Sequence, residues 1–109
     1  MAYGNEMVQK VWEKGRVIAE QDPADWRQDE CGAWMRREQY GQEALEYGWR
    51  IENVSLGGPN ELGNLRPLHC ENSFDAGAGH AKCHVTADQK GIDVREHLHS
   101  PPRNRRVGR

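Results

Sequence analysis

The sequence has no long apolar run and little apolar material of any kind. Hydrophobic residues make up 36% of the 109 positions, and phenylalanine occurs only once. No segment approaches the roughly 20 apolar residues of a transmembrane helix, and the first residues, MAYGNEMVQK, lack the apolar centre of a signal peptide. These absences favour a soluble, intracellular protein with one modest core, to which the four tryptophans contribute large side chains.

Cysteine is also scarce. Cys31, Cys70 and Cys83 make an odd number, without the short repeated spacings of secreted disulfide frameworks. Reduced thiols, or at most one metal cluster, are therefore expected. A possible zinc set comprises Cys70, Cys83, His80 and His84, and Cys31 could join it. Because its spacing matches no common zinc motif, buried or idle thiols are the preferred interpretation.

Positive charge is sparse outside the C-terminal end. The chain has 15 basic and 17 acidic residues, for a net charge of -2. Residues 100–109 hold four basic residues and no acid, so residues 1–99 carry 11 basic against 17 acidic groups, or -6. Such an acidic body is unlike a DNA-binding protein. We expect one domain over residues 1–99 and a basic, disordered tail over residues 100–109. The tail could contact nucleic acid through Arg103, Arg105, Arg106 and Arg109.

Two other charged groups each have two interpretations. One set of acidic residues is expected to be a solvated face, or alternatively a surface that docks on a basic partner. Its members are Glu13, Glu20, Asp22, Asp25, Asp29 and Glu30. Four arginines are expected to pair with neighbouring carboxylates, or alternatively to contact phosphates. These are Arg36, Arg37, Arg50 and Arg66.

Hydrophobic periodicity predicts a small number of elements. Apolar residues in residues 6–18 suit one face of a short helix that is broken near Gly15, and a single helical turn is expected around Trp26. Residues 47–54 alternate as a strand does, and the following Gly- and Pro-rich segment must be a loop. A brief return strand, NLRPLH, is expected to lead into a helix over residues 70–74.

Several pieces of the chain, in their order and spacing, resemble a family of small bacterial and phage HNH endonucleases. They include VWEKG, DPADWRQDECGAWMRR, NELGNLRPLH and CHVTAD, and the resemblance covers residues 11–91. It implies an α+β protein with the ββα-metal fold. In that fold a two-stranded antiparallel hairpin packs on a helix, and the active site lies between them. An N-terminal helix and loop-rich surroundings complete the expected architecture.

The resemblance breaks at the catalytic positions. Where the family has an Asp-His pair, this chain has Glu52 and Asn53, and Ser73 replaces an asparagine ligand. Asn53 cannot act as a general base, because a carboxamide does not titrate near neutral pH, and losing such a base typically costs about 100- to 10,000-fold in rate. Asn64, His69 and Asn72 are the vestigial residues of the site. Glu52, His69 and Asn72 are the candidate ligands should Mg²⁺ or Mn²⁺ bind.

These features predict a catalytically impaired or inactive binding protein that requires no cofactor. Its expected partner is a protein or a nucleoprotein complex in the cytoplasm of a bacterial host. A phage-encoded inhibitor of a host defence nuclease, similar to an anti-CRISPR protein, would suit this pattern. One alternative is a slow metal-dependent HNH endonuclease. The other is a nucleic-acid-binding module that uses the arginine tail.

Overall fold

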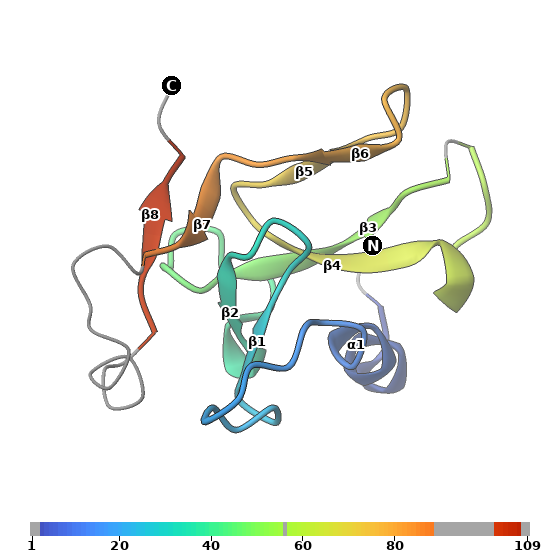
Figure 1. Cartoon of the computed structure of the whole chain (residues 1–109). Coiled ribbons are helices and arrows are strands. Elements are labelled where there is room, and N and C mark those ends of the chain that lie inside the picture. Colours follow the sequence, from blue (N-terminus) through green and yellow to red (C-terminus); the bar gives the residue numbers. More distant parts are fainter. Residues whose placement is uncertain (1–2, 56, 89–101, 108–109) are drawn as a thin grey trace.

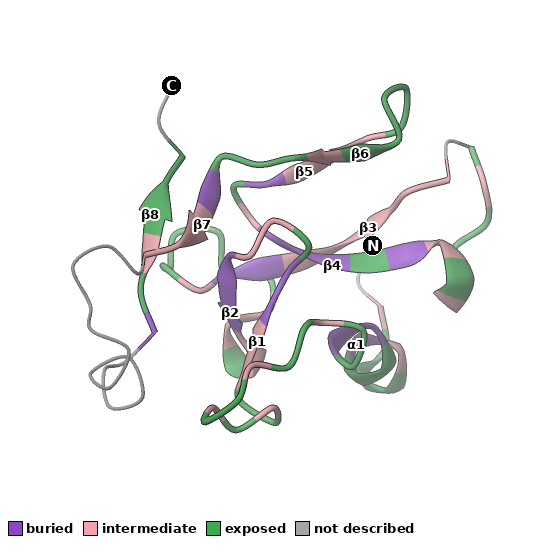
Figure 2. Cartoon of the chain, in the orientation of Figure 1, coloured by how far each residue is buried: buried purple, intermediate pink, exposed green. Residues whose placement is uncertain are grey.

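The computed structural model describes residues 3–55, 57–88 and 102–107. This part of the chain forms one short α-helix, two 3₁₀ turns and eight strands, which pair into four separate two-stranded antiparallel sheets (Figure 1). Figure 2 shows that the buried residues gather where the helix, β2, β3 and β4 approach one another. None of the helical segments described is both long enough and apolar enough to span a bilayer.

Helix α1 spans Asn5–Trp12 and packs one face on the core. Val8, Val11 and Trp12 are buried on that face, as their spacing predicts. The helix ends at Trp12, three residues before the break that the sequence predicts near Gly15. Beyond Trp12 the chain turns, and the backbone of Arg16 pairs with that of Gln28 instead of continuing the helix.

The central hairpin joins β3 (Trp49–Asn53) to β4 (Leu65–His69). Its register runs from Trp49 opposite His69 to Asn53 opposite Leu65, which confirms the predicted strand and its return strand. The 3₁₀ turn η2 (Leu62–Asn64) leads into β4. Trp49 and Leu65 are fully buried and pack with α1 and Met35 in the core cluster. The Trp12 and Trp49 rings lie 5.1 Å apart between centroids.

Strands β1 (Trp26–Gln28) and β2 (Trp34–Arg36) form a second hairpin, and the 3₁₀ turn η1 (Arg37–Gln39) follows it. The helical turn predicted around Trp26 is therefore wrong. The Trp26 ring makes edge-to-face contacts with Trp34 and Tyr47, at centroid distances of 6.1 and 4.8 Å. These contacts come from residues distant in sequence, so tertiary packing overrides the weak local preference.

Strands β5 (Ser73–Asp75) and β6 (His80–Lys82) form a hairpin where the sequence predicted a helix over residues 70–74. The expected ββα-metal fold is therefore wrong, because the described residues that follow the central hairpin form strands and no helix. The backbone N–H of Phe74 donates to the Glu52 carboxylate instead of to a helical carbonyl. The Ala-Gly-Ala-Gly segment then turns the chain, with Gly79 at a φ of 79°.

Strands β7 (Val85–Ala87) and β8 (Asn104–Arg106) pair across a long sequence separation. Strand β8 lies within the segment predicted to be a disordered tail, and the prediction is wrong for these three residues. The Asn104 carboxamide accepts a hydrogen bond from the Trp34 N–H at 2.7 Å and donates one to the Trp34 carbonyl at 3.0 Å. This side chain thus binds β2 much as a neighbouring strand would.

A disulfide joins Cys31, after β1, to Cys83, just before β7. The expectation of reduced thiols is therefore wrong for these two residues, and Cys70 is the free cysteine. The linkage closes a sequence separation of 52 residues, with the two Cα atoms 5.5 Å apart. Odd cysteine number and irregular spacing give no indication of such a bond, because it depends on which segments meet in three dimensions.

Candidate functional site

The predicted metal ligands Glu52 and His69 lie on opposite faces of the central hairpin. Glu52 is paired with Arg66, and His69 is paired with Trp49. Directly paired residues of antiparallel strands share a face, and side chains alternate along a strand. Since residues 66 and 69 are three positions apart, the Glu52 carboxylate and the His69 imidazole point away from each other. The structure does not bring them together.

His69 is a buried structural residue, with 2% of its surface exposed. Its Nε2 lies 2.6 Å from the Glu46 carbonyl oxygen, and its Nδ1 lies 3.0 Å from the Glu71 backbone nitrogen. A carbonyl can only accept and an amide N–H can only donate, so the proton is on Nε2. Both ring nitrogens are occupied, and neither has a lone pair directed at a metal.

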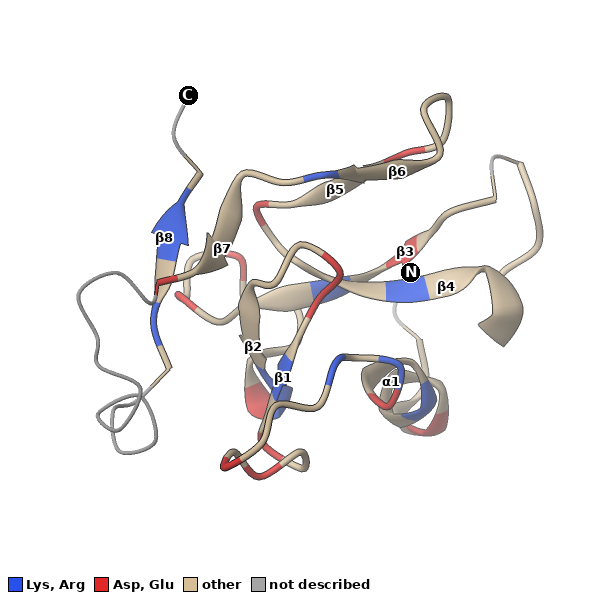
Figure 3. Ribbon diagram, viewed as in Figure 1, with Lys and Arg blue, Asp and Glu red and all other residues tan. Residues whose placement is uncertain are grey.

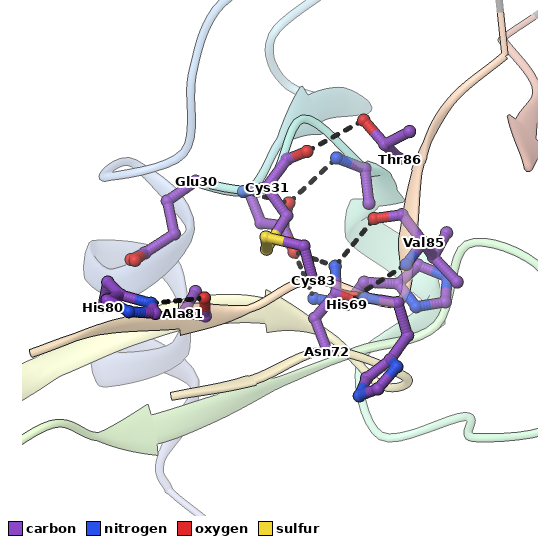
Figure 4. Close-up of a disulfide and its surroundings, with 12 residues drawn as sticks. Glu30, Cys31, His69, Asn72, His80, Ala81, Cys83, Val85 and Thr86 are labelled. Carbon is purple, nitrogen blue, oxygen red and sulfur yellow. Dashed lines mark hydrogen bonds between the residues drawn. A yellow bond between two sulfur atoms is a disulfide. The ribbon is translucent and has the colours of Figure 1, made fainter. Parts of the chain in front are cut away.

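Asn72 is fully buried and makes four hydrogen bonds. Its Nδ2 donates to Asp29 Oδ2 at 3.0 Å and to the Val85 carbonyl at 3.1 Å. Its Oδ1 accepts from the backbone N–H groups of His84 and Val85, at 2.7 and 2.9 Å. Figure 4 shows this side chain between the disulfide and β7. Asn72 therefore fastens β7 to the rest of the protein, and its amide has no atom left for another ligand.

Asp29 is the centre of the same network, although the sequence placed it on a solvated acidic face. It is only 1% exposed, so that expectation is wrong for this residue. Oδ1 accepts from the N–H groups of Cys31 and Ala33, both at 2.9 Å. Oδ2 accepts from the His69 N–H and the Asn72 carboxamide. Four donors stabilise a carboxylate without a cation beside it.

We name Asp29, His69 and Asn72 the buried polar network. It connects the β1–β2 turn, the end of β4 and the start of β7. Sequence reasoning assigned two of its members to a catalytic site and missed the structural role of the third. One indication was available for Asp29: an Asp that precedes a glycine by three residues is typical of a turn capped by its own carboxylate, and Gly32 here has a φ of 84°.

The remaining degenerate and vestigial positions support loops and strand ends. Asn53 Nδ2 donates to the carbonyls of Gly58 and Pro59, at 3.1 and 3.0 Å. Asn64 donates to the same Pro59 carbonyl at 2.9 Å, so both asparagines hold the loop between β3 and β4. Ser73 pairs with Lys82 at the start of β5. None of these three side chains is placed beside His69.

The possible zinc set is also dispersed. Cys83 is consumed in the disulfide with Cys31. His80 is exposed, and its Nδ1 lies 3.0 Å from the Ala81 carbonyl. Burial raises the pKa of the Cys70 thiol, which disfavours the thiolate that zinc requires. Within residues 3–55, 57–88 and 102–107, no group of three or more His, Cys, Asp or Glu side chains could hold a metal ion.

The predicted basic residues Arg103, Arg105 and Arg106 are exposed on or beside β8, where Figure 3 shows a run of positive charge. The Arg106 guanidinium lies 2.5 Å from the Glu71 carboxylate. A hollow of about 190 Å³ adjoins this strand and includes Arg105 and Arg106 in its lining. Arg109 lies outside the described residues.

Three of the four other arginines pair with carboxylates, as the sequence predicted. The partners are Glu38 for Arg36, Glu52 for Arg50 and Glu30 for Arg66, at 3.3, 3.6 and 2.9 Å. Arg37 differs, since its Nε donates to the Gln9 carboxamide. Three of these four arginines therefore neutralise acids of the same protein.

Comparisons of the chain with protein-family models, with curated proteins and with solved structures give no match.

Proposed function

We propose that this protein is a non-catalytic binding protein that docks through β8 on a partner protein or a nucleoprotein complex. The observation that carries the proposal is the basic strand itself: three exposed arginines stand on or beside a strand that is fixed to the fold. Tyr47 donates its hydroxyl hydrogen to the Pro102 carbonyl, and Asn104 is bound to Trp34 on both sides. A backbone fixed before binding loses less conformational entropy when the complex forms.

The distribution of charge in this protein favours a partner that contains protein over a free DNA duplex. Arg106 is neutralised by Glu71, whereas Arg103 has no side-chain partner among the described residues. Residues 1–99 carry a charge of -6, which disfavours the approach of a DNA backbone. A partner protein whose surface has an acidic patch bounded by neutral or basic residues fits this arrangement better. Complementary charge between the two proteins would give specificity and rapid association.

A host defence nuclease bound to its nucleic acid is one nucleoprotein partner of this kind, and it lies in the cytoplasm of a bacterial host. Thiols are kept reduced in that compartment. Binding there has to survive reduction of the Cys31–Cys83 bond, so the binding experiment needs parallel samples with and without dithiothreitol. Retention of the partner in both would agree with this location.

Charge reversal on β8 is expected to abolish capture of the partner. The full chain, immobilised, would be exposed to a bacterial lysate as wild type, as Arg103→Glu/Arg105→Glu, and as the matched control Lys10→Glu on α1. Reversing two exposed cations at an interface should weaken binding by roughly 100-fold or more. Mass spectrometry should find a protein captured by the wild type and the control but not by the double variant. The same proteins captured by all three would refute the docking role of β8.

Nucleic-acid binding by the same arginines is the second candidate. It predicts that a fluorescent DNA duplex binds with strong salt dependence, and that the double variant reduces the logarithmic salt slope by about two. The leading proposal predicts that the DNA duplex does not bind at physiological salt. It also predicts that a protein partner is still captured after the lysate has been treated with nuclease.

A further inference from the structure

A cavity of about 300 Å³ lies between the chain that leaves α1, strand β1 and strand β4. It borders the buried polar network through Asp29 and shares no lining residue with the hollow beside β8, and Figure 3 shows basic positions on both the segment after α1 and β4. Its lining includes the cations Lys14, Arg16 and Arg66 together with Gln28. Its volume is at the lower end of the roughly 300–1,000 Å³ of small-molecule sites.

The three cations retain donors that an occupant could use. Lys14 Nζ donates to the carbonyls of Leu62 and Leu65, and an ammonium has a third donor. Arg66 uses one guanidinium nitrogen on Glu30, at 2.9 Å. The Arg16 side chain has no hydrogen-bond or ion-pair partner among the described residues. Burial and the nearby Arg66 lower the pKa of the Lys14 ammonium, so positive charge in this cavity is incompletely neutralised.

Gln28 supplies a further polar group that an occupant of the cavity could use. The residue is only 5% exposed, it lines the cavity, and its carboxamide makes no hydrogen bond within the described part of the chain. Its polar atoms are not closed off from solvent, so they are open to water or to a ligand in the cavity. The two acids of the lining are already engaged, Asp29 by four N–H donors and Glu30 by Arg66.

We propose that this cavity binds the phosphate group of a small phosphomonoester. A monoester carries a charge of about -1.5 to -2 at neutral pH on three terminal oxygens, which matches three cations, two of them on the segment after α1 and one on β4. A carboxylate has one charge and two oxygens, and a single guanidinium would satisfy it. A phosphodiester likewise carries one charge. Gln28 would meet either a phosphate oxygen or a polar atom of the attached organic group.

The test uses phenyl phosphate, dimethyl phosphate and benzoate as probes of the full chain, followed by backbone amide NMR and calorimetry. Phenyl phosphate is expected to bind and to shift the amides of Lys14, Arg16, Gln28 and Arg66. The other two probes should bind at least tenfold more weakly. Equal binding of benzoate or dimethyl phosphate, or no shifts at millimolar phenyl phosphate, would overturn the proposal.

Two variants and a control make the assignment specific. Arg16→Gln should weaken phenyl phosphate binding by about tenfold, because it removes a charge-assisted contact without removing a contact within the protein. Glu30→Gln should strengthen binding several-fold, since it frees Arg66. Lys10→Gln, which changes an exposed cation of α1 that is absent from the lining of the cavity, should leave the dissociation constant unchanged. Binding that is insensitive to Arg16→Gln would place the probe elsewhere and refute the site.

Discussion

Replacing Asn72 with alanine is expected to lower the free energy of unfolding by about 3–5 kcal/mol, because the buried carboxamide makes four hydrogen bonds to groups of the protein. The substitution leaves the Val85 N–H and carbonyl without their partners and removes one of the four donors to Asp29. Each unsatisfied buried group costs roughly 1–3 kcal/mol. Urea denaturation followed by tryptophan fluorescence would measure the loss as a lower transition midpoint.

Asn64→Ala is the matched control for this measurement. It removes the same chemical group, but Asn64 makes one hydrogen bond to a loop carbonyl in a partly exposed position. Its expected cost is below about 1 kcal/mol, since water can replace the lost partner. Equal losses for the two variants would show that the buried polar network contributes nothing special to stability. A domain of this size has only about 5–15 kcal/mol in total, so the difference is large.

Asn72 and Asn64 have the same predicted role but different surroundings in the structure. Both residues belong to pieces that resemble HNH endonucleases, and both were interpreted as remnants of a catalytic site. In the structure the DECGAW and NLRPLH pieces meet through the hydrogen bond from the His69 N–H to Asp29, at 2.9 Å. Polar residues in fixed spacing can therefore indicate a buried hydrogen-bond network as readily as a site of chemistry. Sequence alone does not separate the two, because burial decides between them.

The elements that the sequence predicted correctly are those with local determinants. Helix α1 and the β3–β4 hairpin follow from apolar periodicity and from a Gly-rich loop between the strands. Strands β7 and β8 have three residues each and pair with each other across a long sequence separation. Strand β8, for example, depends on Trp34, which is 70 positions away from Asn104. No local pattern in a three-residue basic segment indicates such a partner.

The same distinction applies to the candidate sites. The arginines of residues 103–106 were found as a binding candidate because charge is visible in the sequence. The cavity was not predicted, since Lys14, Gln28 and Arg66 are unremarkable individually and become a set only when the segment after α1, strand β1 and strand β4 pack together. Gln28 is the clearest case. A lone glutamine in a sequence is expected on the surface, and only the structure places it in the lining of a cavity.

Removing the disulfide is expected to have an effect of similar size to Asn72→Ala, by a different physical route. Cross-linking residues 52 positions apart restricts the unfolded chain, and the loop-entropy relation gives about 4 kcal/mol for a loop of this length. Cys31→Ser/Cys83→Ser should therefore lower the free energy of unfolding by about that amount. Because Thr86 and Ala87 also bond to the backbone of Cys31 and Gly32, the folded contacts should persist.

Reduction with dithiothreitol removes the disulfide without changing any residue. It therefore separates the effect of the cross-link on the free energy of unfolding from any effect of the serine substitutions themselves. Reduction should lower the urea midpoint of the wild type to that of the double serine variant, and it should leave the variant itself unchanged. Cys70→Ser, which removes the free thiol, should retain the full response to dithiothreitol. A wild-type midpoint that stays constant while mass spectrometry shows complete reduction would contradict the role of the bond. If the response is as expected, the attachment of β7, and with it the basic strand β8, is least secure in a reducing compartment. The reduced protein is therefore the form in which binding through β8 is most stringently tested.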